Sequence, residues 1–421
     1  MKKTRRRKIH FLNILLTFWL TFAGVVIVGV AGILIYNSIV GKADAVALSP
    51  SGLSEVVSHM FSEKIPEEEA GAGEEALALS GRYGEILADK EYMAQNNIYA
   101  KEAASAEEVT LSFGGDILFD PSYSVMAKLL QRKNGLYDSI SAELLEEMKS
   151  ADILMLNNEF PYSDRGTPTP EKQFTFRARP ESASLLDDMG VDIVSLANNH
   201  AYDYGEAALL DSLDILKDVG MPYVGAGRNL EEAAKPVYFI INDIKIAYLS
   251  ATQIERLDNP DTKGATDNSA GVFRCWNPEG LLEAVKAAKE NSDFVVVYIH
   301  WGTENTEQLD PAQLDQAPRI VEAGADLIIG DHPHCLQPIQ YVDGVPVVYS
   351  LGNFWFNSKQ VDTCLIKAAI DGNGLKNLKF IPALQKDCQT SLLEGVEKER
   401  VLAYMRAISP GVNIDEEGNI N

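Results

Sequence analysis

The chain has 421 residues, enough for one large or two medium domains with buried cores. Its formal net charge of −24 argues against nucleic acid as a partner, because phosphate binding needs clustered Lys and Arg. The same charge argues against an anionic polymer as a ligand unless bound cations supply positive charge.

The first forty residues combine a basic cluster at 1–10 with an uncharged apolar run at 11–40. A bilayer-spanning helix needs roughly 20 apolar residues, so the run predicts a transmembrane signal anchor. The positive flank predicts a cytoplasmic N-terminus, with the rest of this single-pass protein extracellular at the cell membrane. A cleaved signal peptide is the alternative, because GKADAVA offers a small-residue cleavage site after Val40. The length of the run favours the uncleaved anchor.

Residues 41–108 are acidic and rich in Ala, and they show no regular strand pattern. This composition predicts a stalk, partly helical and partly disordered, that holds the following domain away from the membrane. The domain itself is predicted to cover residues 109–421.

From Val109 onwards, apolar strands alternate with helical segments, which predicts an α/β layered fold. Apolar strands are typical of sheets that are covered on both faces. Ser141 is a predicted N-cap, and Pro318 predicts an interruption of its helix. The predicted strands cover 109–116, 152–160, 191–200, 245–251, 293–302, 325–334 and 345–354, and the predicted helices cover 125–132, 141–149, 182–190, 205–220 and 310–324.

Side chains that can bind metal follow these strands, and ligands of α/β sheets collect beyond the carboxyl ends of strands. Four of the six histidines lie at strand ends, which predicts a metal site of mixed nitrogen and oxygen ligands for Mn, Fe or Zn. Two cations together could activate water and stabilise the attacking and leaving oxygens. The side chains at these ends are Asp116, Asn158, Glu159, Asn198, Asn199, His200, Asp203, His300, Glu304, Asp331, His332, His334 and Asn353.

Other conspicuous side chains leave alternatives open. Arg177 and Arg179 could clamp a carboxylate or phosphate of the substrate, or form surface ion pairs. Packing is favoured over substrate stacking for the aromatic residues near the strand ends, which are Trp301, Phe354 and Trp355. The four cysteines form no CxxC pair, and either disulfides or partly buried thiols are compatible with the sequence; they are Cys275, Cys335, Cys364 and Cys388.

Six motifs in chain order resemble those of the CapA family of poly-γ-glutamate capsule biosynthesis proteins, which belongs to the metallo-dependent phosphatase-like superfamily. They are GGDILF, NNEF, LANNHAYDYG, HWGTEN, GDHPHCLQP and YSLGNF. The resemblance covers about residues 109–356. It implies a calcineurin-like metallophosphatase fold, which is an α/β/β/α sandwich.

The resemblance also implies roles for single residues. His200 would face the substrate as an acid or electrostatic stabiliser, and Asp203 and Glu304 would orient the imidazoles. Asn353 would fix a loop at the rim, and it joins Arg177, Arg179 and Glu304 as a candidate substrate-binding residue. The implied ligands of one or two divalent metal ions are Asp116, Glu159, Asn199, His300, His332 and His334.

Two positions depart from the superfamily pattern. Asp116 is followed by Ile117 and Leu118, where typical superfamily phosphatases carry Asp-x-His, so that histidine is missing. Asp331 stands where the family often has a histidine. Glu159 is the candidate replacement for the lost ligand.

Three functions are compatible with these features. The first is a membrane-anchored extracellular component of poly-γ-glutamate capsule biosynthesis or export, acting on an anionic polymer beside membrane-bound polymer synthase subunits, with a metal centre that could be hydrolytic. The second is an extracellular metal-dependent phosphoesterase, against which the missing Asp-x-His counts. The third is a non-catalytic scaffold of a membrane polymer synthase, against which the four gathered histidines count.

Overall fold

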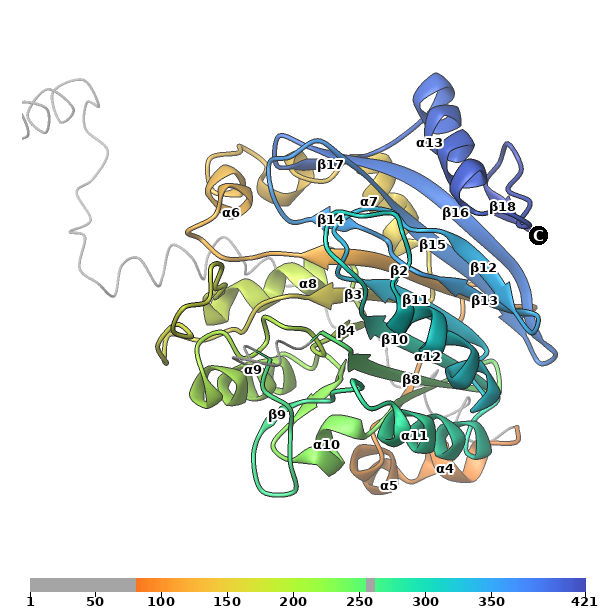
Figure 1. The fold of residues 1–421 in the computed structure, drawn as a ribbon. Coiled ribbons are helices and arrows are strands. Elements are labelled where there is room, and N and C mark those ends of the chain that lie inside the picture. Colours follow the sequence, from red (N-terminus) through yellow and green to blue (C-terminus); the bar gives the residue numbers. More distant parts are fainter. Residues whose placement is uncertain (1–80, 255–261) are drawn as a thin grey trace, which may run out of the picture. The chain divides into compact units, whose positions relative to one another are not determined.

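The computed structural model describes residues 81–254 and 262–421, which form two β-sheets packed face to face with helices on the outer faces (Figure 1). This arrangement is the α/β/β/α sandwich expected from the sequence. We call the two sheets the β10 sheet and the β2 sheet, after a central strand of each. No helix in the described ranges is long and apolar enough to span a bilayer, and the predicted anchor at 11–40 lies outside these ranges.

Each sheet contains a block of parallel strands flanked by antiparallel ones. The β10 sheet runs in the order β1 (Ile98–Ala100), β7 (Val237–Ile241), β8 (Ile244–Thr252), β10 (Phe294–His300), β11 (Leu327–Asp331), β13 (Val345–Val348) and β12 (Ile339–Val342). The β2 sheet runs in the order β17 (Gln389–Leu392), β16 (Gly374–Lys386), β15 (Val361–Asp371), β2 (Val109–Ile117), β3 (Ile153–Asn158), β4 (Ile193–Ser195) and β5 (Tyr223–Val224). Three further pairings involve β14 (Asn353–Trp355) with β2, β18 (Asn419–Ile420) with β16, and β6 (Ala226–Gly227) with β9 (Gly271–Val272).

Strand β10 shows why the strands are apolar throughout. Phe294, Val296 and Tyr298 point into the core between the two sheets, while Val295 and Val297 point into the core under the outer helices. All five side chains are buried, because successive side chains of the strand point alternately into one core and then the other.

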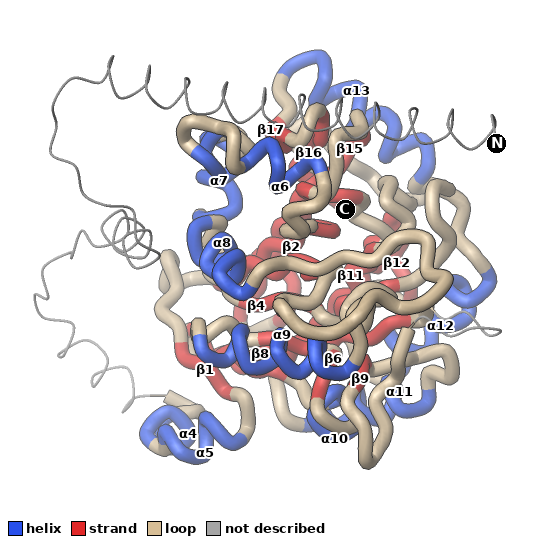
Figure 2. The backbone as a smooth tube through the Cα atoms, turned by 90° about the vertical axis from the view of Figure 1, so that its left-hand side faces the viewer, coloured by secondary structure: helices blue, strands red, loops and turns tan. Residues whose placement is uncertain are grey.

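The helices cover the outer faces of the sandwich. In Figure 2, α7 and α8 lie on one side of the strands, and α11 and α12 lie on the other. The helices over the β2 sheet are α6 (Ser124–Leu129), α7 (Ala142–Lys149), α8 (Ser184–Asp188) and α9 (Glu206–Asp218), with the 3₁₀ turns Gly135–Asp138 and Pro180–Ala183 between them. The helices over the β10 sheet are α10 (Leu230–Ala234), α11 (Glu279–Glu290) and α12 (Pro311–Glu322), and α13 (Gly395–Ile408) packs into the inter-sheet core.

Most predicted elements are present, with three differences. The Ser141 side chain caps α7 by accepting a hydrogen bond from the Leu144 N–H, as predicted. Helix α12 continues through Pro318, so the predicted interruption is wrong; a proline removes one backbone hydrogen bond, and the packed helix tolerates that loss. Strand β4 is only three residues long, which leaves Asn198–His200 in the following loop.

The third difference lies in the segment predicted as a stalk. Residues 84–100 form helices α4 (Gly84–Ala88) and α5 (Lys90–Gln95) and then β1, which pairs in parallel with β7 at the sheet edge. Helices and a strand of this domain therefore precede Val109. A strand of three residues, of which only Ile98 is buried, leaves too little hydrophobic pattern to be predicted.

A β-bulge near the end of β2 directs Asp116 towards the other sheet. Phe113 pairs with Met155 and Asp116 with Asn157, so β2 has one residue more than β3 in this interval. Gly114 and Gly115 provide the extra length. A Cβ atom on Gly115 would lie 1.8 Å from the Gly352 carbonyl oxygen, so only glycine allows this close approach.

We expect Gly115→Ala to lower the free energy of unfolding by about 1–3 kcal/mol, because backbone atoms rather than a flexible side chain block the new methyl group. Urea unfolding of the metal-free protein measures this loss. Gly372→Ala is the control, since a Cβ atom there meets nothing within 4 Å. An unfolding midpoint of Gly115→Ala equal to that of the control would contradict the prediction.

Candidate metal centre

The carboxyl ends of parallel strands from both sheets meet at one edge of the sandwich. Strand register places His300 of β10 opposite Asp331 of β11, and Asp116 of β2 opposite Asn157 of β3. The two sheets are joined at this edge, where the Tyr298 hydroxyl donates to the Gly114 carbonyl at 2.8 Å. Side chains that are far apart in the sequence thus converge in one buried volume.

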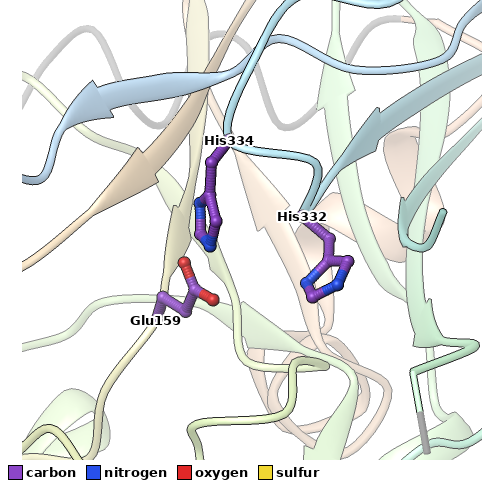
Figure 3. A group of neighbouring side chains, drawn as sticks. All are labelled: Glu159, His332 and His334. Carbon is purple, nitrogen blue, oxygen red and sulfur yellow. The ribbon is translucent and has the colours of Figure 1, made fainter. Parts of the chain in front are cut away.

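Two groups of three side chains have the composition and spacing of metal sites. Glu159, His332 and His334 form the first group, with ligand atoms within 4.8 Å of one another. Figure 3 shows the Glu159 carboxylate and the His334 ring pointing towards each other, with the His332 ring beside them. The second group has the same spacing and contains Asp116, His300 and Asp331.

The first group depends on an unusual backbone in the segment between β11 and β12. His332 has φ 95° and His334 has φ 56°, which are left-handed conformations that cost roughly 1–3 kcal/mol each in a residue other than glycine. Nδ1 of His334 lies 2.8 Å from Oδ1 of Asn353 and 3.1 Å from Oδ2 of Asp116. These acceptors favour a proton on Nδ1, which leaves Nε2 available as a ligand atom.

His300 is the centre of the second group and is fully buried. Its Nδ1 lies 2.9 Å from Oδ1 of Asp331, and its Nε2 lies 2.8 Å from Oδ1 of Asn199. The same Nε2 is 3.0 Å from Nδ1 of His332 and 3.6 Å from Oε1 of Glu159. The two groups are therefore in direct contact with each other.

Unpartnered oxygen atoms show that the centre fits cations. Both carboxylate oxygens of Glu159 and Oδ2 of Asp331 are buried without a hydrogen-bond partner among the described residues. Burying a carboxylate in this state is costly unless a cation or a proton neutralises it. The mixture of imidazole and carboxylate ligands suits a divalent transition metal, so the residues fit the predicted metal.

The pKa values of the three carboxyl groups in the centre are shifted in different directions. Burial, reinforced by the charge of Asp116, raises the pKa of Glu159 well above its ordinary range. Burial and Asp116 raise the pKa of Asp331 in the same way. Burial would also raise the pKa of Asp116, but the hydrogen bond and charge of His334 outweigh it, and that pKa is lowered. Asp116 is therefore the acid that carries the negative charge without metal.

The pKa values of the histidines in the centre are also shifted in different directions. Burial lowers the pKa of His300 to about 3 and that of His332 well below its ordinary value. Burial also opposes charge on His334, but the hydrogen bond to Asp116 and the charge of that carboxylate outweigh it and raise the pKa of His334 to about 9. In the metal-free centre, His334 and Asp116 consequently form an ion pair beside two neutral imidazoles.

His200 lies at the border of the centre. Its Nδ1 is 2.7 Å from Oδ2 of Asp203, and its Nε2 is 4.0 Å from Oε1 of Glu159. The ring of Phe176 packs on the imidazole with 4.2 Å between ring centroids. Burial lowers the pKa of His200, although the charge of Asp203 opposes this effect. The imidazole is thus held along one edge and on one face, with its free nitrogen on the side of the ligands.

The remaining predicted site residues lie around this centre. Asn353 contacts His334 as described, whereas Glu304 is exposed and has no hydrogen bond to another described residue. Its charge nevertheless contributes to raising the pKa of His334. The guanidinium of Arg177 stacks on the Tyr204 ring at 4.2 Å. Arg179 is exposed and lies 3.9 Å from the carboxylate of Glu181.

The sequence analysis missed two contributors and gave a third no role as a ligand. Asp331, listed there as a side chain at a strand end and as a departure from the family, belongs to the second ligand group. Asn157 donates to Asp116 at 2.8 Å, and its position at the end of an apolar strand was the available signal. Lys172 lies in a loop without any pattern and contacts Asp203. The aromatic residues are buried by packing and the cysteines are free thiols; these are Trp301, Phe354 and Trp355, and Cys275, Cys335, Cys364 and Cys388.

Comparison with known proteins identifies the family. The model of the bacterial capsule synthesis protein family PGA_cap matches residues 110–358, more than half of the chain. The chain belongs to this family. The resemblance to CapA proteins, predicted from six motifs, is thereby confirmed.

Individual relatives agree with this assignment. This PGA_cap chain is 31% identical to the PGA biosynthesis protein CapA of Bacillus subtilis over 66% of its own length and 72% of the relative. It is 29% identical to the capsule biosynthesis protein CapA of Bacillus anthracis, over 70% of this chain and 72% of that relative. A crystal structure of the 5'-nucleotidase of Candida albicans is 10% identical over 67% of this chain and 53% of that one, with a TM-score of 0.35, a likeness too weak to carry an argument.

We expect metal binding to release protons and to strengthen as the pH rises towards about 9, because the ligands Glu159, Asp331 and His334 must lose protons that their raised pKa values retain in the metal-free protein. Calorimetric titration with Mn²⁺ in two buffers of different ionisation enthalpy measures the protons released. Equal binding enthalpies in the two buffers would contradict the prediction.

Proposed function

We propose that this chain is a membrane-anchored, extracellular and metal-dependent component of poly-γ-glutamate capsule biosynthesis that hydrolyses the polymer or an amide bond related to it. The observation that carries the proposal is the pair of ligand groups with buried, unpartnered carboxylate oxygens in a member of the capsule synthesis family. A scaffold has no need of such a costly arrangement. Membrane-bound subunits of a polymer synthase are the proposed partners.

Charge supports an anionic substrate in spite of the acidic chain. Two divalent cations, of Mn, Zn or Fe, would carry more positive charge than Asp116, Glu159 and Asp331 carry negative charge. The loaded centre would then attract a carboxylate-bearing polymer, which the metal-free centre with its His334–Asp116 ion pair would not attract. Arg177 is the proposed outer contact, since stacking on Tyr204 holds its guanidinium in place.

Each part of the centre then has a task. Bound metal ions would activate water and polarise the bond to be cleaved. Nε2 of His200 would take a proton from the attacking water and return it to the leaving amine, because Nδ1 is held by Asp203. Phe176 would exclude water from the face of the imidazole on which it packs. The N-terminal segment at 11–40 would hold this centre outside the cell.

We expect the Mn²⁺-loaded full-length chain to release free amines from poly-γ-glutamate, and a chelator to abolish the release. Glu159→Gln should reduce both bound metal and amine release by roughly 10–100-fold, because it removes one negative ligand. Amine assay and elemental mass spectrometry measure the two quantities. Glu290→Gln, on the exposed side of α11, is the control.

The other outcomes of that experiment are equally informative. Hydrolysis of p-nitrophenyl phosphate without any amine release would replace the proposal with the phosphoesterase. Full metal content without turnover of either substrate would leave the scaffold of a polymer synthase.

We expect His200→Asn to lower the rate of amine release by roughly 10²–10⁴-fold, because the amide cannot donate a proton as the imidazole does. Bound metal should stay at the wild-type level, since His200 belongs to neither ligand group. Parallel rate and metal measurements test this separation. A rate within twofold of wild type would exclude His200 as the proton donor.

A further inference from the structure

Lys172 is a buried cation at the border of the metal centre. It lies in the loop between β3 and α8, and its side chain is only 5% exposed. The ammonium lies 2.6 Å from Oδ1 of Asp203 and also donates to the backbone carbonyl of Asn199. A lysine is rarely buried without a paired charge, and this one has its partner in Asp203.

Asp203 is the point at which this loop is attached. Its Oδ2 accepts from Nδ1 of His200 and from the Phe176 N–H, both at 2.7 Å, which leaves Oδ1 for Lys172. The Asp203 carbonyl accepts from the backbone and hydroxyl of Thr169, at 2.8 and 3.0 Å. Four of these five hydrogen bonds come from the loop and the fifth comes from His200, so Asp203 fixes the loop against the imidazole.

Asn199 connects the same lysine to the ligands. Its backbone carbonyl accepts a hydrogen bond from the Lys172 ammonium, and its side-chain Oδ1 lies 2.8 Å from Nε2 of His300. Lys172 is therefore the one described side chain that contacts both the carboxylate orienting His200 and the backbone of a proposed metal ligand. Both contacts are direct hydrogen bonds, and the side chains of Lys172 and Asp203 are 5% and 0% exposed.

We propose that Lys172 is a positioning residue that fixes the tautomer of His200 through Asp203 and the orientation of Asn199 through its carbonyl. The inference rests on the proposed function, because it assigns Lys172 to the same site. Because Lys172 donates to Oδ1 of Asp203, the other carboxylate oxygen, Oδ2, accepts the hydrogen bond from the Nδ1–H of His200. The unprotonated Nε2 then faces the ligands, where it can receive and return a proton.

The matched control is Lys101. Its ammonium also bridges an aspartate and a backbone carbonyl, those of Asp192 and Asp152, at a part-buried position. Neither partner belongs to the metal centre. Lys101→Met and Lys172→Met therefore remove the same type of interaction, and both should lower the melting temperature.

The test uses the full-length chain with ¹⁵N-labelled histidine rings and no metal, and His200→Asn assigns the His200 signals. We expect Lys172→Met to convert His200 from the Nδ1–H tautomer to a mixture of both tautomers, and Lys101→Met to leave it unchanged. An unchanged tautomer in Lys172→Met, or an equal change in both variants, would overturn the proposal. If Lys172→Met fails to fold, Lys172→Gln replaces it.

A second measurement separates this proposal from the proposed function. We expect Lys172→Met to weaken Mn²⁺ binding by roughly 10–100-fold in a calorimetric titration, while Lys101→Met binds as wild type does. Wild-type affinity in Lys172→Met would overturn the role assigned through Asn199. A wild-type chain that binds no Mn²⁺ would refute the proposed function, and the tautomer, measured without metal, would still decide the role of Lys172.

Discussion

Three carboxylates buried in one small volume are the constraint on which the centre depends. Asp116, Glu159 and Asp331 are fully buried, and only Asp116 has a cationic partner, which is His334. Glu159 and Asp331 have oxygens without a partner within residues 81–254 and 262–421, and they therefore hold protons or bind cations. The left-handed backbone at His332 and His334 adds a further cost at the same place. A fold selected for stability alone would have removed these features, and divalent ions would make use of all of them.

Neither sheet alone contains all the residues of the metal centre, and the sandwich brings the two sets together. Asp116 and Glu159 come from the β2 sheet, whereas His300 and Asp331 come from the β10 sheet. Each ligand group takes residues from both sheets or from the loops that leave them. The glycine bulge before Asp116 matters for the same reason, since it directs one strand end towards the other sheet. Stability of the inter-sheet core and geometry of the centre are therefore coupled.

The departures from the superfamily pattern form a consistent set in the structure. Leu118, at the position of the missing histidine, is buried in the apolar core that includes residues of α6 and α7, and its side chain has no atom that can bind a metal ion. Asp331, where the family often has histidine, joins the second ligand group instead. The centre consequently carries more negative charge than one with two further imidazoles. Extra carboxylate ligands favour Mn²⁺ among the three proposed metals, because Mn²⁺ suits oxygen ligands better than Zn²⁺ does.

The sequence by itself determined the layered α/β class and the approximate strands, and it named the candidate site residues, because apolar strands followed by His, Asp, Glu and Asn form a pattern along the chain. The six motifs, found in the same order along the chain as in the CapA family, were also sufficient to predict the family. Only the tertiary structure decided how ligands divide into two groups, that Asp331 belongs to one of them, and that Lys172 contacts Asp203. Lys172 and Asp203 are 31 positions apart in segments without periodicity. Their meeting is decided by how the loop crosses the strand ends, and local sequence carries no information about that path.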